Sequence, residues 1–438
     1  MSSFSEKYIR GARYLLPAPF TIAIILTLVV YIISVLGMGN GWLETAEFWE
    51  GKLWEGNNFA FQCMYMLVVG HVIALSKPFD KATDWLLDTV DNGATAALVV
   101  TLVSVITGLF NWGLGLITGA IFARKVGEYA KRNSIPIHYG IIGAAGYAGL
   151  MVWHGGLSGS APLLISKEHE LSSLMGIIPT SETIFSKMNI AASLLLMGLL
   201  PILMFFVAKK TKPVPIYIPK LASPRKSSDK LIGAENLDHS HWFARITGFV
   251  LLAYVIYRLV DVGLFNLGLN IMNLALFAIA VLLHKNIFSF VRALDRAIVD
   301  GAGILIQFPL YFGIMGIMQD GGIAHAMSDY FVSISTALTL PLYTFISAGI
   351  INVFVPSGGG QWAVQGPIII EACQALGVDL SKGIMAMCYG DQLTNMLQPF
   401  WALPLLGITG LKAKDILPYT LILMLGGIVI FTIVLLIF

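Results

Sequence analysis

The sequence predicts an all-α integral membrane protein: two inverted repeats with about nine transmembrane helices, two re-entrant hairpins and broken helices. The first observation is composition, since 57% of the 438 residues are hydrophobic and only 12% are charged, whereas a soluble domain is about one-quarter charged. The second is the gathering of these residues into long apolar runs. The third is an internal repeat whose helices are broken at matching places.

Nine apolar runs are long enough to cross a bilayer as helices of roughly 20 residues. They are continuously apolar and do not alternate with period two, which argues against a β-barrel. The first run is too long for a signal peptide and no small-residue cleavage site follows it, so we expect it to be retained. The predicted spans are 17–37, 57–76, 136–166, 187–208, 242–262, 266–284, 300–318, 383–410 and 417–437.

Two further stretches, 94–124 and 333–370, are each long enough for two half-length helices. Asn and Gly residues break both near the middle, at 111–113 and at 352–360. A run broken at mid-length favours a re-entrant hairpin, whose non-helical tip must be buried in protein or face a water-filled cavity. Residues 136–166 and 383–410 are interrupted in the same way, so we expect each to be a broken helix.

The lysines and arginines support this path through the membrane. With both hairpins re-entrant, every Lys/Arg-rich segment falls on one side, as the positive-inside rule requires. The N-terminus is then cytoplasmic and the C-terminus lies outside. Segments 42–55 and 286–298 mix charged with aromatic or apolar residues and suit helices in the membrane interface. The basic segments are 7–13, 77–81, 124–132, 209–230, 285–296 and 412–414.

The two halves repeat each other at an almost constant offset, with Asn111 matching Asn352 at 241 residues and Tyr147 matching Tyr389 at 242. We therefore divide the chain into a first repeat at 1–208, a cytoplasmic linker at 209–241, a connecting transmembrane helix at 242–262 and a second repeat at 263–438. One connecting span turns the second repeat upside down. Inverted repeats with broken helices meeting near the midplane are typical of secondary transporters.

Four irregular segments should converge on a site: 111–115, 153–162, 352–362 and 391–401. Half-helix N-termini offer positive partial charge to an anion, and freed carbonyl groups can hold Na⁺. Serine and glutamine side chains add donors without fixed charge, which suits a carboxylate that must be released. The predicted substrate-binding residues are Asn111, Trp112, Gly113, Trp153, His154, Gly156, Ser158, Ser160, Ser357, Gly358, Gly359, Gly360, Gln361, Asn395 and Gln398.

Asp391, Asn111 and Asn352 are the predicted ion-coupling residues, with a Na⁺ site possible at the two asparagines. An acid within an apolar helix is costly and usually functional, and at an offset of 242 Asp391 matches the uncharged Gly149. Proton carrier, cation ligand and structural hydrogen-bond acceptor all stay open for Asp391. The asparagines could instead cap helix ends, and His154 could be a core histidine with its hydrogen bonds satisfied.

Enzyme functions find little support, and no catalytic residue is predicted. The sequence contains no H-E-x-x-H, G-x-x-x-x-G-K-[ST] or G-x-S-x-G motif. Tyr389-Gly390-Asp391 is similar to part of an intramembrane aspartyl protease motif, but Cys388 stands where that motif has glycine and the second aspartate is missing. The three cysteines form neither a disulfide framework nor a zinc pattern. A channel remains the other class, although Gly358–Gly360 lacks the repeated carbonyl filter of potassium channels.

The chain resembles the AtoE-type short-chain fatty acid transporters of bacteria over nearly its whole length, from Leu16-Pro17-Ala18 to the last span. It departs from the family pattern where Gly, His and Glu are usual, with His154, Gln361 and Asp391 in their places. The segments that carry the resemblance are Asn111-Trp112-Gly113, Ser158-Gly159-Ser160-Ala161-Pro162-Leu163, Val355-Pro356-Ser357-Gly358-Gly359-Gly360, Gln365-Gly366-Pro367 and Gln398-Pro399-Phe400-Trp401-Ala402-Leu403-Pro404.

The resemblance implies uptake of acetoacetate, butyrate or similar monocarboxylates across the bacterial cytoplasmic membrane, driven by H⁺ or Na⁺. It also implies kinship with inverted-repeat elevator transporters, and hence a homodimer embedded in lipid with no nucleic-acid partner. No cofactor is expected apart from the coupling ion. The alternatives are an anion channel and a transporter of another small carboxylate, such as a dicarboxylate.

Overall fold

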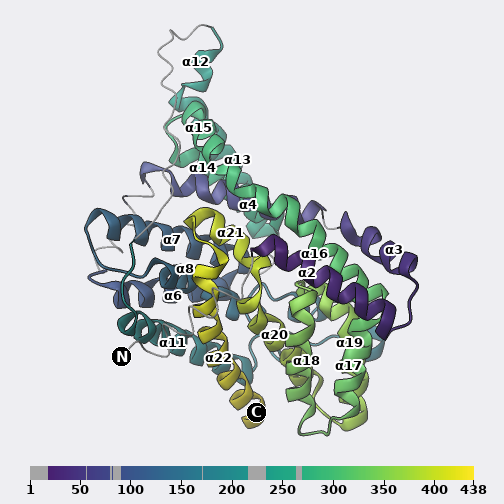
Figure 1. Cartoon of the computed structure of the whole chain (residues 1–438). Helices are drawn as coiled ribbons and strands as arrows, with labels where there is room; N and C mark the ends of the chain where they lie inside the picture. Colours follow the sequence, from purple (N-terminus) through teal and green to yellow (C-terminus); the bar gives the residue numbers. More distant parts are fainter. Residues whose placement is uncertain are drawn as a thin grey trace.

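The computed structural model confirms an all-helical multi-pass membrane protein (Figure 1). It describes residues 18–55, 57–78, 81, 90–169, 171–215, 233–262 and 269–438, which form helices and loops and no strand. The basic N-terminal segment, Gly56, much of the 209–241 linker and residues 263–268 lie outside the described residues.

The first half of the chain begins with an exposed apolar helix, α2, which continues as one π-helical turn at Ile33–Gly37. A 3₁₀ turn at Ala148–Met151 and an irregular loop then separate α8 from α9, which confirms that residues 136–166 form a broken helix. The helices of this half are α2 (Pro19–Ile32), α3 (Trp42–Leu53), α4 (Asn57–Ala74), α6 (Gly93–Phe110), α7 (Trp112–Arg132), α8 (Tyr139–Tyr147), α9 (Ser160–Ile165), α10 (Ser172–Met175) and α11 (Lys187–Lys210).

The second half repeats this order after the short α12 (Glu235–Asp238) and the connecting helix α13 (His241–Val262). Its broken helix has a 3₁₀ turn at Asn395–Leu397 between α20 and α21. Helix α17 lies between the predicted span 300–318 and the predicted hairpin 333–370, where no helix was predicted. The elements are α14 (Leu269–Leu283), α15 (Ile287–Ala297), α16 (Ala302–Asp320), α17 (Ile323–Ser333), α18 (Leu340–Phe354), α19 (Gly358–Leu376), α20 (Leu380–Thr394), α21 (Pro399–Thr409) and α22 (Ala413–Ile437).

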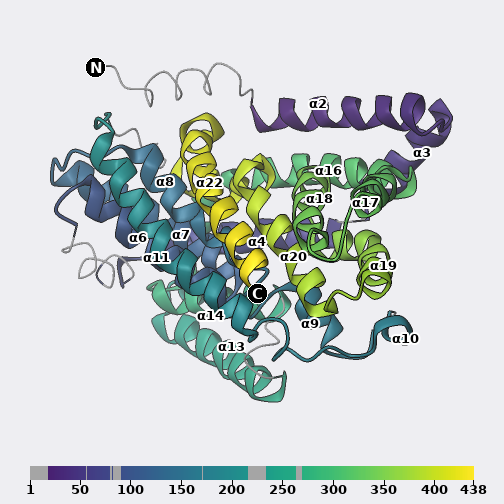
Figure 2. The same ribbon diagram turned by 90° about the horizontal axis from the view of Figure 1, so that it is seen from below.

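The two halves exchange packing partners. Helix α4 of the first half packs against α14 and α15 of the second, while α16, its counterpart, packs against α2 and α3. Figure 2 shows α16 running beside α2. Two glycines of α16 permit the close approach of α3, because a Cβ atom at Gly313 would collide with the Trp49 ring and one at Gly316 with the Phe48 carbonyl oxygen. This exchange joins the halves into one framework.

Glycines also bring each broken helix against the first arm of the hairpin in its own half. A Cβ atom on Gly149 would collide with the carbonyl oxygen of Ser104 in α6. In the second half, a Cβ atom on Gly390 would collide with the carbonyl oxygen of Phe345 in α18. Both contacts are backbone against backbone, which only glycine allows at this distance. Hairpin and broken helix are therefore packed as one block in each half.

Five described helices are long and apolar enough to cross a membrane: Pro19–Gly37, Gly93–Phe110, Lys187–Lys210, His241–Asp261 and Ala413–Ile437. The prediction of half-length hairpin arms is wrong for three of the four arms, since α6 has 18 residues, α7 has 21 and α19 has 19, whereas α18 has 15. Helices α7 and α19 continue past the predicted apolar runs, which end at 124 and 370, into more polar turns, as at Lys131 and Arg132. The re-entrant path of both hairpins stays a prediction.

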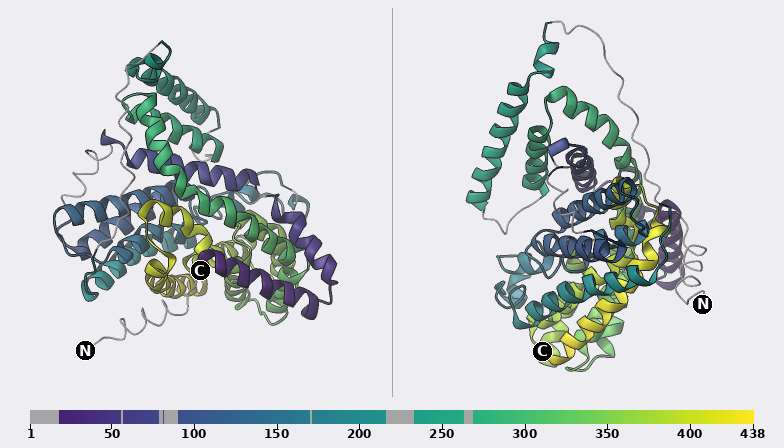
Figure 3. Two further views of the ribbon diagram at one scale, coloured as in Figure 1. Left: turned by 45° about the horizontal axis from the view of Figure 1, so that its top comes forward. Right: turned by 90° about the vertical axis from the view of Figure 1, so that its left-hand side faces the viewer.

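Helices α12 to α15 form an arm that stands out from the rest of the molecule, as Figures 1 and 3 show. Helix α13 packs mainly against α14 and leaves one large apolar face uncovered. The side chains of that face include Trp242, Phe249, Val250, Tyr257 and Val260, each more than 60% exposed. A face of this kind belongs against lipid or another apolar surface rather than water.

The charge asymmetry predicts that Phe438 lies outside the cytoplasm. A reporter enzyme that is active only outside, fused after Phe438, should therefore be active, while a reporter that works only in the cytoplasm should be silent. Fusions after Lys210 are the control and should show the opposite pattern. Cytoplasmic activity of the Phe438 fusion would overturn the nine-span path.

Candidate functional site

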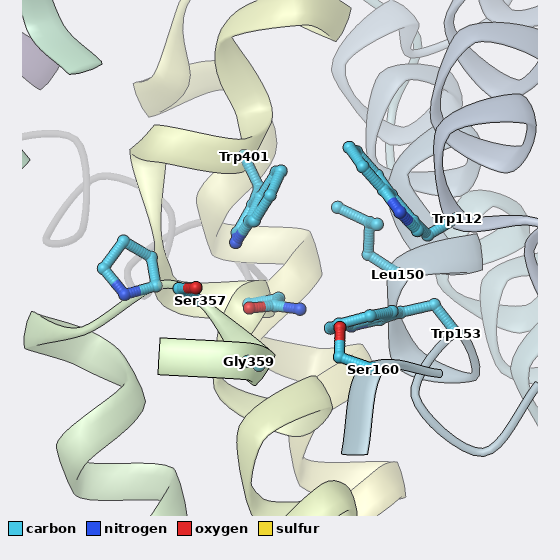
Figure 4. A pocket seen from close by; sticks show the side chains of 10 residues that line it. Trp112, Leu150, Trp153, Ser160, Ser357, Gly359 and Trp401 are labelled. Carbon is cyan, nitrogen blue, oxygen red and sulfur yellow. The ribbon is translucent and has the colours of Figure 1, made fainter. Parts of the chain in front are cut away.

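A pocket with about 430 Å³ of empty space lies where the two hairpin tips and the two broken helices meet. Trp112 and Trp153 line one side of the pocket, Ser357 and Gly359 face them, and Trp401 lies above (Figure 4). The lining residues are Trp112, Leu150, Trp153, Ser160, Pro356, Ser357, Gly358, Gly359, Asn395 and Trp401.

Three tryptophans form the apolar part of the pocket. The Trp112 ring lies edge-on to Trp401 at 5.2 Å between centroids and edge-on to Trp153 at 6.5 Å. Edge-to-face packing at these distances is favourable and fixes the rings relative to one another. The indoles therefore offer a rigid apolar surface that suits a short hydrocarbon chain.

The N-terminus of α19 forms the polar part of the pocket. Ser357 is the N-cap, and its side-chain oxygen accepts a hydrogen bond from the Gly360 amide at 3.2 Å. The Gly358 and Gly359 amides precede the first intrahelical bond, and within the described residues they donate no hydrogen bond. Both glycines line the pocket. Two amide donors at the positive end of a helix dipole suit a carboxylate.

At the tip of the first hairpin, the amides at the N-terminus of α7 are already hydrogen-bonded within the protein. Asn111 is the N-cap of α7, and its Oδ1 accepts hydrogen bonds from the amides of Gly113 and Leu114 at 3.0 and 3.1 Å. The Trp112 amide donates to Ser158 Oγ at 2.9 Å, so this serine holds the first turn as well. These amides are thus engaged within the protein. The two tips occupy matching positions, but only the α19 tip has free donors among the described residues.

His154 and Asp391 form a buried pair beside the α19 tip. The Asp391 carboxylate Oδ2 hydrogen-bonds His154 Nδ1, and both side chains are at most 1% exposed. The Ala161 amide donates to His154 Nε2 at 3.2 Å. Since Nε2 accepts, the proton of a neutral imidazole lies on Nδ1 and is donated to Asp391. The Trp153 ring stacks on His154 at 4.4 Å between centroids and separates it from the indole side of the pocket.

Amide oxygens gather on the far side of Asp391. Asn352 Nδ2 donates to the Asp391 carbonyl oxygen at 2.7 Å, and Thr394 Oγ1 and Asn395 Oδ1 each lie 3.0 Å from the same nitrogen. Gln398 Nε2 donates to the Asn352 carbonyl oxygen. Asn352 Oδ1 and Gln398 Oε1 are buried and have no donor within the described residues. Buried oxygens without donors form the kind of surroundings that hold Na⁺.

Comparison with known proteins places the chain in a family. The model of the family described as "Short chain fatty acid transporter" matches residues 1–438. The chain belongs to the short-chain fatty acid transporter family. Two curated relatives carry names that call them candidate short-chain fatty acid transporters. The Escherichia coli protein is 34% identical over 99% of this chain and 98% of its own; the Haemophilus influenzae protein is 34% identical over 96% and 94%.

Among solved structures, the chain is similar to the YdaH transporter of Alcanivorax borkumensis, with 14% identity, a TM-score of 0.40, and coverage of 95% of this chain and 98% of that one. It is also similar to MtrF of Neisseria gonorrhoeae, with 14% identity, a TM-score of 0.33, and coverage of 97% of both chains. The family consists of transporters and not of enzymes.

Of the residues that the sequence predicts for substrate binding in this family member, seven line the pocket: Trp112, Trp153, Ser160, Ser357, Gly358, Gly359 and Asn395. Gly113 instead faces Met66 of α4, and Gly156 lies against the Leu109 carbonyl group. Gln361 Nε2 donates to the Ala348 carbonyl oxygen at 2.9 Å and to Gln365 at 2.7 Å, inside the second hairpin.

Gly360 lies at the same helix start, where its carbonyl oxygen accepts a hydrogen bond from Gln319 at 3.1 Å. Three lining residues were missed: Leu150, Pro356 and Trp401. Trp401 is the last residue of the irregular segment 391–401, and that position could have predicted that it lines the pocket. Leu150 is an ordinary apolar residue with no sequence signal of its own.

The packing also corrects one match between the repeats. Gly149 and Gly390 occupy equivalent places against the first arms of their hairpins, at an offset of 241 residues. Asp391 therefore corresponds to Leu150, not to Gly149 as the offset of 242 predicts. Leu150 lines the pocket. The asymmetry remains, because the first repeat still has no charge at this position.

Two adjacent glycines provide a test of how tightly the α19 tip fits. A Cβ atom on Gly358 would lie 2.8 Å from His154 Cε1, 2.9 Å from Trp153 and 3.2 Å from Asp391 Oδ2, whereas one on Gly359 would meet nothing within 4 Å. Gly358→Ala should therefore destabilise the protein by about 1–3 kcal/mol, as overpacking does. Gly359→Ala is the matched control and should keep the wild-type Tm in detergent. Equal Tm values for the two variants would contradict this geometry.

Proposed function

We propose that this chain is a secondary active transporter that imports short-chain fatty acids, such as acetoacetate or butyrate, across the cytoplasmic membrane. One observation carries the proposal: the pocket combines the open N-terminus of α19 with a wall of three tryptophans. A short-chain fatty acid has the matching two ends, a carboxylate and a small hydrocarbon tail. Membership of the family supports the same substrate class.

In the proposed complex, the carboxylate accepts hydrogen bonds from the Gly358 and Gly359 amides. Ser160 and Asn395, which line the same pocket, add side-chain donors. The tail lies against the indoles. No lysine or arginine is among the described residues that line the pocket, so the anion is held by dipoles and hydrogen bonds alone. One such anion subsite favours a monocarboxylate over a dicarboxylate, which would need a second.

Asp391 provides the proposed coupling to protons. The carboxylate of Asp391 lies close to Gly358, since a Cβ atom there would be 3.2 Å from Oδ2. Two negative charges about 5 Å apart repel by roughly 3 kcal/mol at an effective dielectric near 20. That energy corresponds to a loss of roughly a hundredfold in affinity. The anion therefore binds when Asp391 is neutralised, and proton and substrate travel together.

The contacts of His154 limit where the His154–Asp391 pair can accept an added proton. A second proton on the imidazole would sit on Nε2, where the Ala161 amide already points a hydrogen at 3.2 Å. Two donors facing each other are unfavourable. His154 holds the Asp391 carboxylate in place through its Nδ1–H group, and the pair as a whole is the proposed site of the added proton.

Na⁺ coupling is the second candidate, and the oxygen cluster favours it. Rotation of the Asn352 amide would turn Oδ1 toward the Asp391 carbonyl oxygen, Thr394 Oγ1 and Asn395 Oδ1, which now surround Nδ2. Gln398 Oε1 adds another buried oxygen. Asn111 is a poorer ligand in this scheme, because its Oδ1 already accepts two backbone hydrogen bonds.

We further propose an elevator mechanism in a homodimer. The hairpins and broken helices would form the mobile unit, since glycines pack them together within each half. The helices that exchange partners between the halves, α2 to α4 and α14 to α16, would form the scaffold. The later part of the uncovered apolar face of α13, with Tyr257 and Val260, suits a second copy at the scaffold. Native mass spectrometry of the purified protein would test the dimer, and a single monomer peak at all concentrations would exclude it.

Asp391→Asn tests the coupling. The neutral side chain keeps the size of the carboxylate but cannot take up and release a proton, so accumulation against a gradient should be lost while equilibrium exchange of labelled butyrate continues. Both are measured in the same proteoliposomes. Asp329→Asn is the control, because that exposed aspartate pairs with the exposed His325 at 3.3 Å, away from the pocket. Wild-type accumulation by Asp391→Asn would leave Asp391 a structural role.

Uptake by the same proteoliposomes distinguishes proton coupling from Na⁺ coupling. If protons couple, a pH gradient alone should drive uptake and a Na⁺ gradient alone should not. If Na⁺ couples, the reverse should hold, and Asn352→Ala should abolish the Na⁺ dependence. Uptake that needs neither gradient and shows single-channel currents would identify a channel.

A further inference from the structure

A second and larger cavity, with about 1,320 Å³ of empty space, lies away from the substrate pocket and shares no lining residue with it. Its walls are the chain after α4, the start of α13, the turn between α14 and α15, and α15 itself. These segments belong to both repeats and to the connecting helix. The polar lining residues are Ser76, Lys77, His241, Arg245, His284, Lys285, Ser289, Arg292 and Arg296.

The cavity is strongly cationic. Five of its side chains carry a positive charge at neutral pH, and they come from all of its walls: Lys77, Arg245, Lys285, Arg292 and Arg296. Within the part of the chain that the structure describes, no aspartate or glutamate lines it. Like charges brought together repel one another. A cavity with this charge attracts anionic ligands and counterions.

Its walls are fixed to one another by specific contacts. His241 Nδ1 hydrogen-bonds the Lys285 carbonyl oxygen at 2.7 Å, and Asn286 Nδ2 donates to the His239 carbonyl oxygen at 3.1 Å. The His239 ring stacks on Phe288 at 4.3 Å between centroids. These contacts tie the start of α13 to the turn before α15. The cations therefore belong to a constructed cavity and not to a row of independent surface side chains.

The residues around the cationic cavity are of the kinds found at a bilayer interface. Helix α15 has charged and apolar residues on opposite faces, as interfacial helices do. Leu75, Leu282, Leu283 and Ala293 line the cavity beside the cations. Exposed apolar side chains continue from it along α13, such as Trp242 and Ile246, which are 72% and 60% exposed. A ligand with an anionic head and long apolar tails matches both parts.

We propose that this cavity binds the headgroup of an anionic phospholipid, with its acyl chains along α13 and α14. Basic pockets between membrane helices on the cytoplasmic side are suited to headgroups that carry phosphates. The guanidinium groups of Arg245 and Arg296 can hold phosphate oxygens through paired hydrogen bonds. A bound lipid would bridge the connecting helix to both repeats. The site is independent of the substrate and of the coupling ion.

The test uses delipidated, purified full-length protein. Diphosphatidylglycerol, phosphatidylethanolamine, inorganic phosphate and butyrate are added separately, and binding is followed by native mass spectrometry and by the shift in Tm. Diphosphatidylglycerol should bind and raise the Tm, whereas zwitterionic phosphatidylethanolamine should do neither. If inorganic phosphate binds as tightly as the lipid, the site is for a soluble phosphate. If butyrate competes for the cavity, it serves the substrate. Either result overturns the proposal.

A charge-matched pair of triple variants locates the site. Arg245→Gln with Lys285→Gln and Arg296→Gln removes three cations from three walls of the cavity. Each Lys or Arg near a membrane surface contributes enough attraction that losing three should weaken lipid binding by roughly a hundredfold. The control, Lys131→Gln with Lys209→Gln and Lys210→Gln, removes three exposed cations elsewhere and should change binding less than threefold. Equal loss in both variants would show non-specific attraction and overturn the proposal.

Discussion

A helix that breaks inside a membrane exposes backbone N–H and C=O groups, and each must find a partner within the protein because lipid offers none. The arrangement of this molecule depends on how its four breaks meet that requirement. At the α7 tip, Asn111 and Ser158 take up the freed amides. At the α19 tip, Ser357 accepts from one amide, and the amides of Gly358 and Gly359 have no acceptor among the described residues. These two amides are the basis for proposing that the second tip binds an anion.

The surroundings of that tip set the conditions under which an anion can enter. The carboxylate of Asp391 lies beside it, held by His154. The backbone around the pair is held from several sides, since Gln392 Oε1 accepts hydrogen bonds from the amides of His154 and Gly155 at 2.9 and 3.2 Å. In the proposed transport cycle, the fixed dipoles of α19 would attract the substrate carboxylate, and the Asp391 carboxylate would repel it until its charge is neutralised. Substrate binding would then depend on a second ion, which is the requirement for coupled transport.

Apolar runs and glycine-rich breaks were enough to predict the helical membrane fold, the order of elements and the four segments that converge. Helical patterns do not show which side chains meet across distant segments. His154 and Asp391 were singled out for separate roles, yet they are hydrogen-bonded across 237 residues of sequence. The lengths of α7 and α19 were missed because these two helices continue through polar turns. The predicted match of Asp391 with Gly149 is wrong because the offset between the repeats changes between 241 and 242 residues along the broken helix.

The distribution of cations follows from the opposite demands of transport and anchoring. A fixed lysine or arginine beside a substrate carboxylate in a low-dielectric pocket would bind it strongly and slow its release. The described pocket lining has none and relies on helix dipoles, whose partial charges act within one turn. The peripheral cavity faces no such limit, and five cations gather there. The lipid proposed for that cavity would remain bound, because it would join α13 to the scaffold. The substrate proposed for the α19 tip would instead have to leave in every transport cycle.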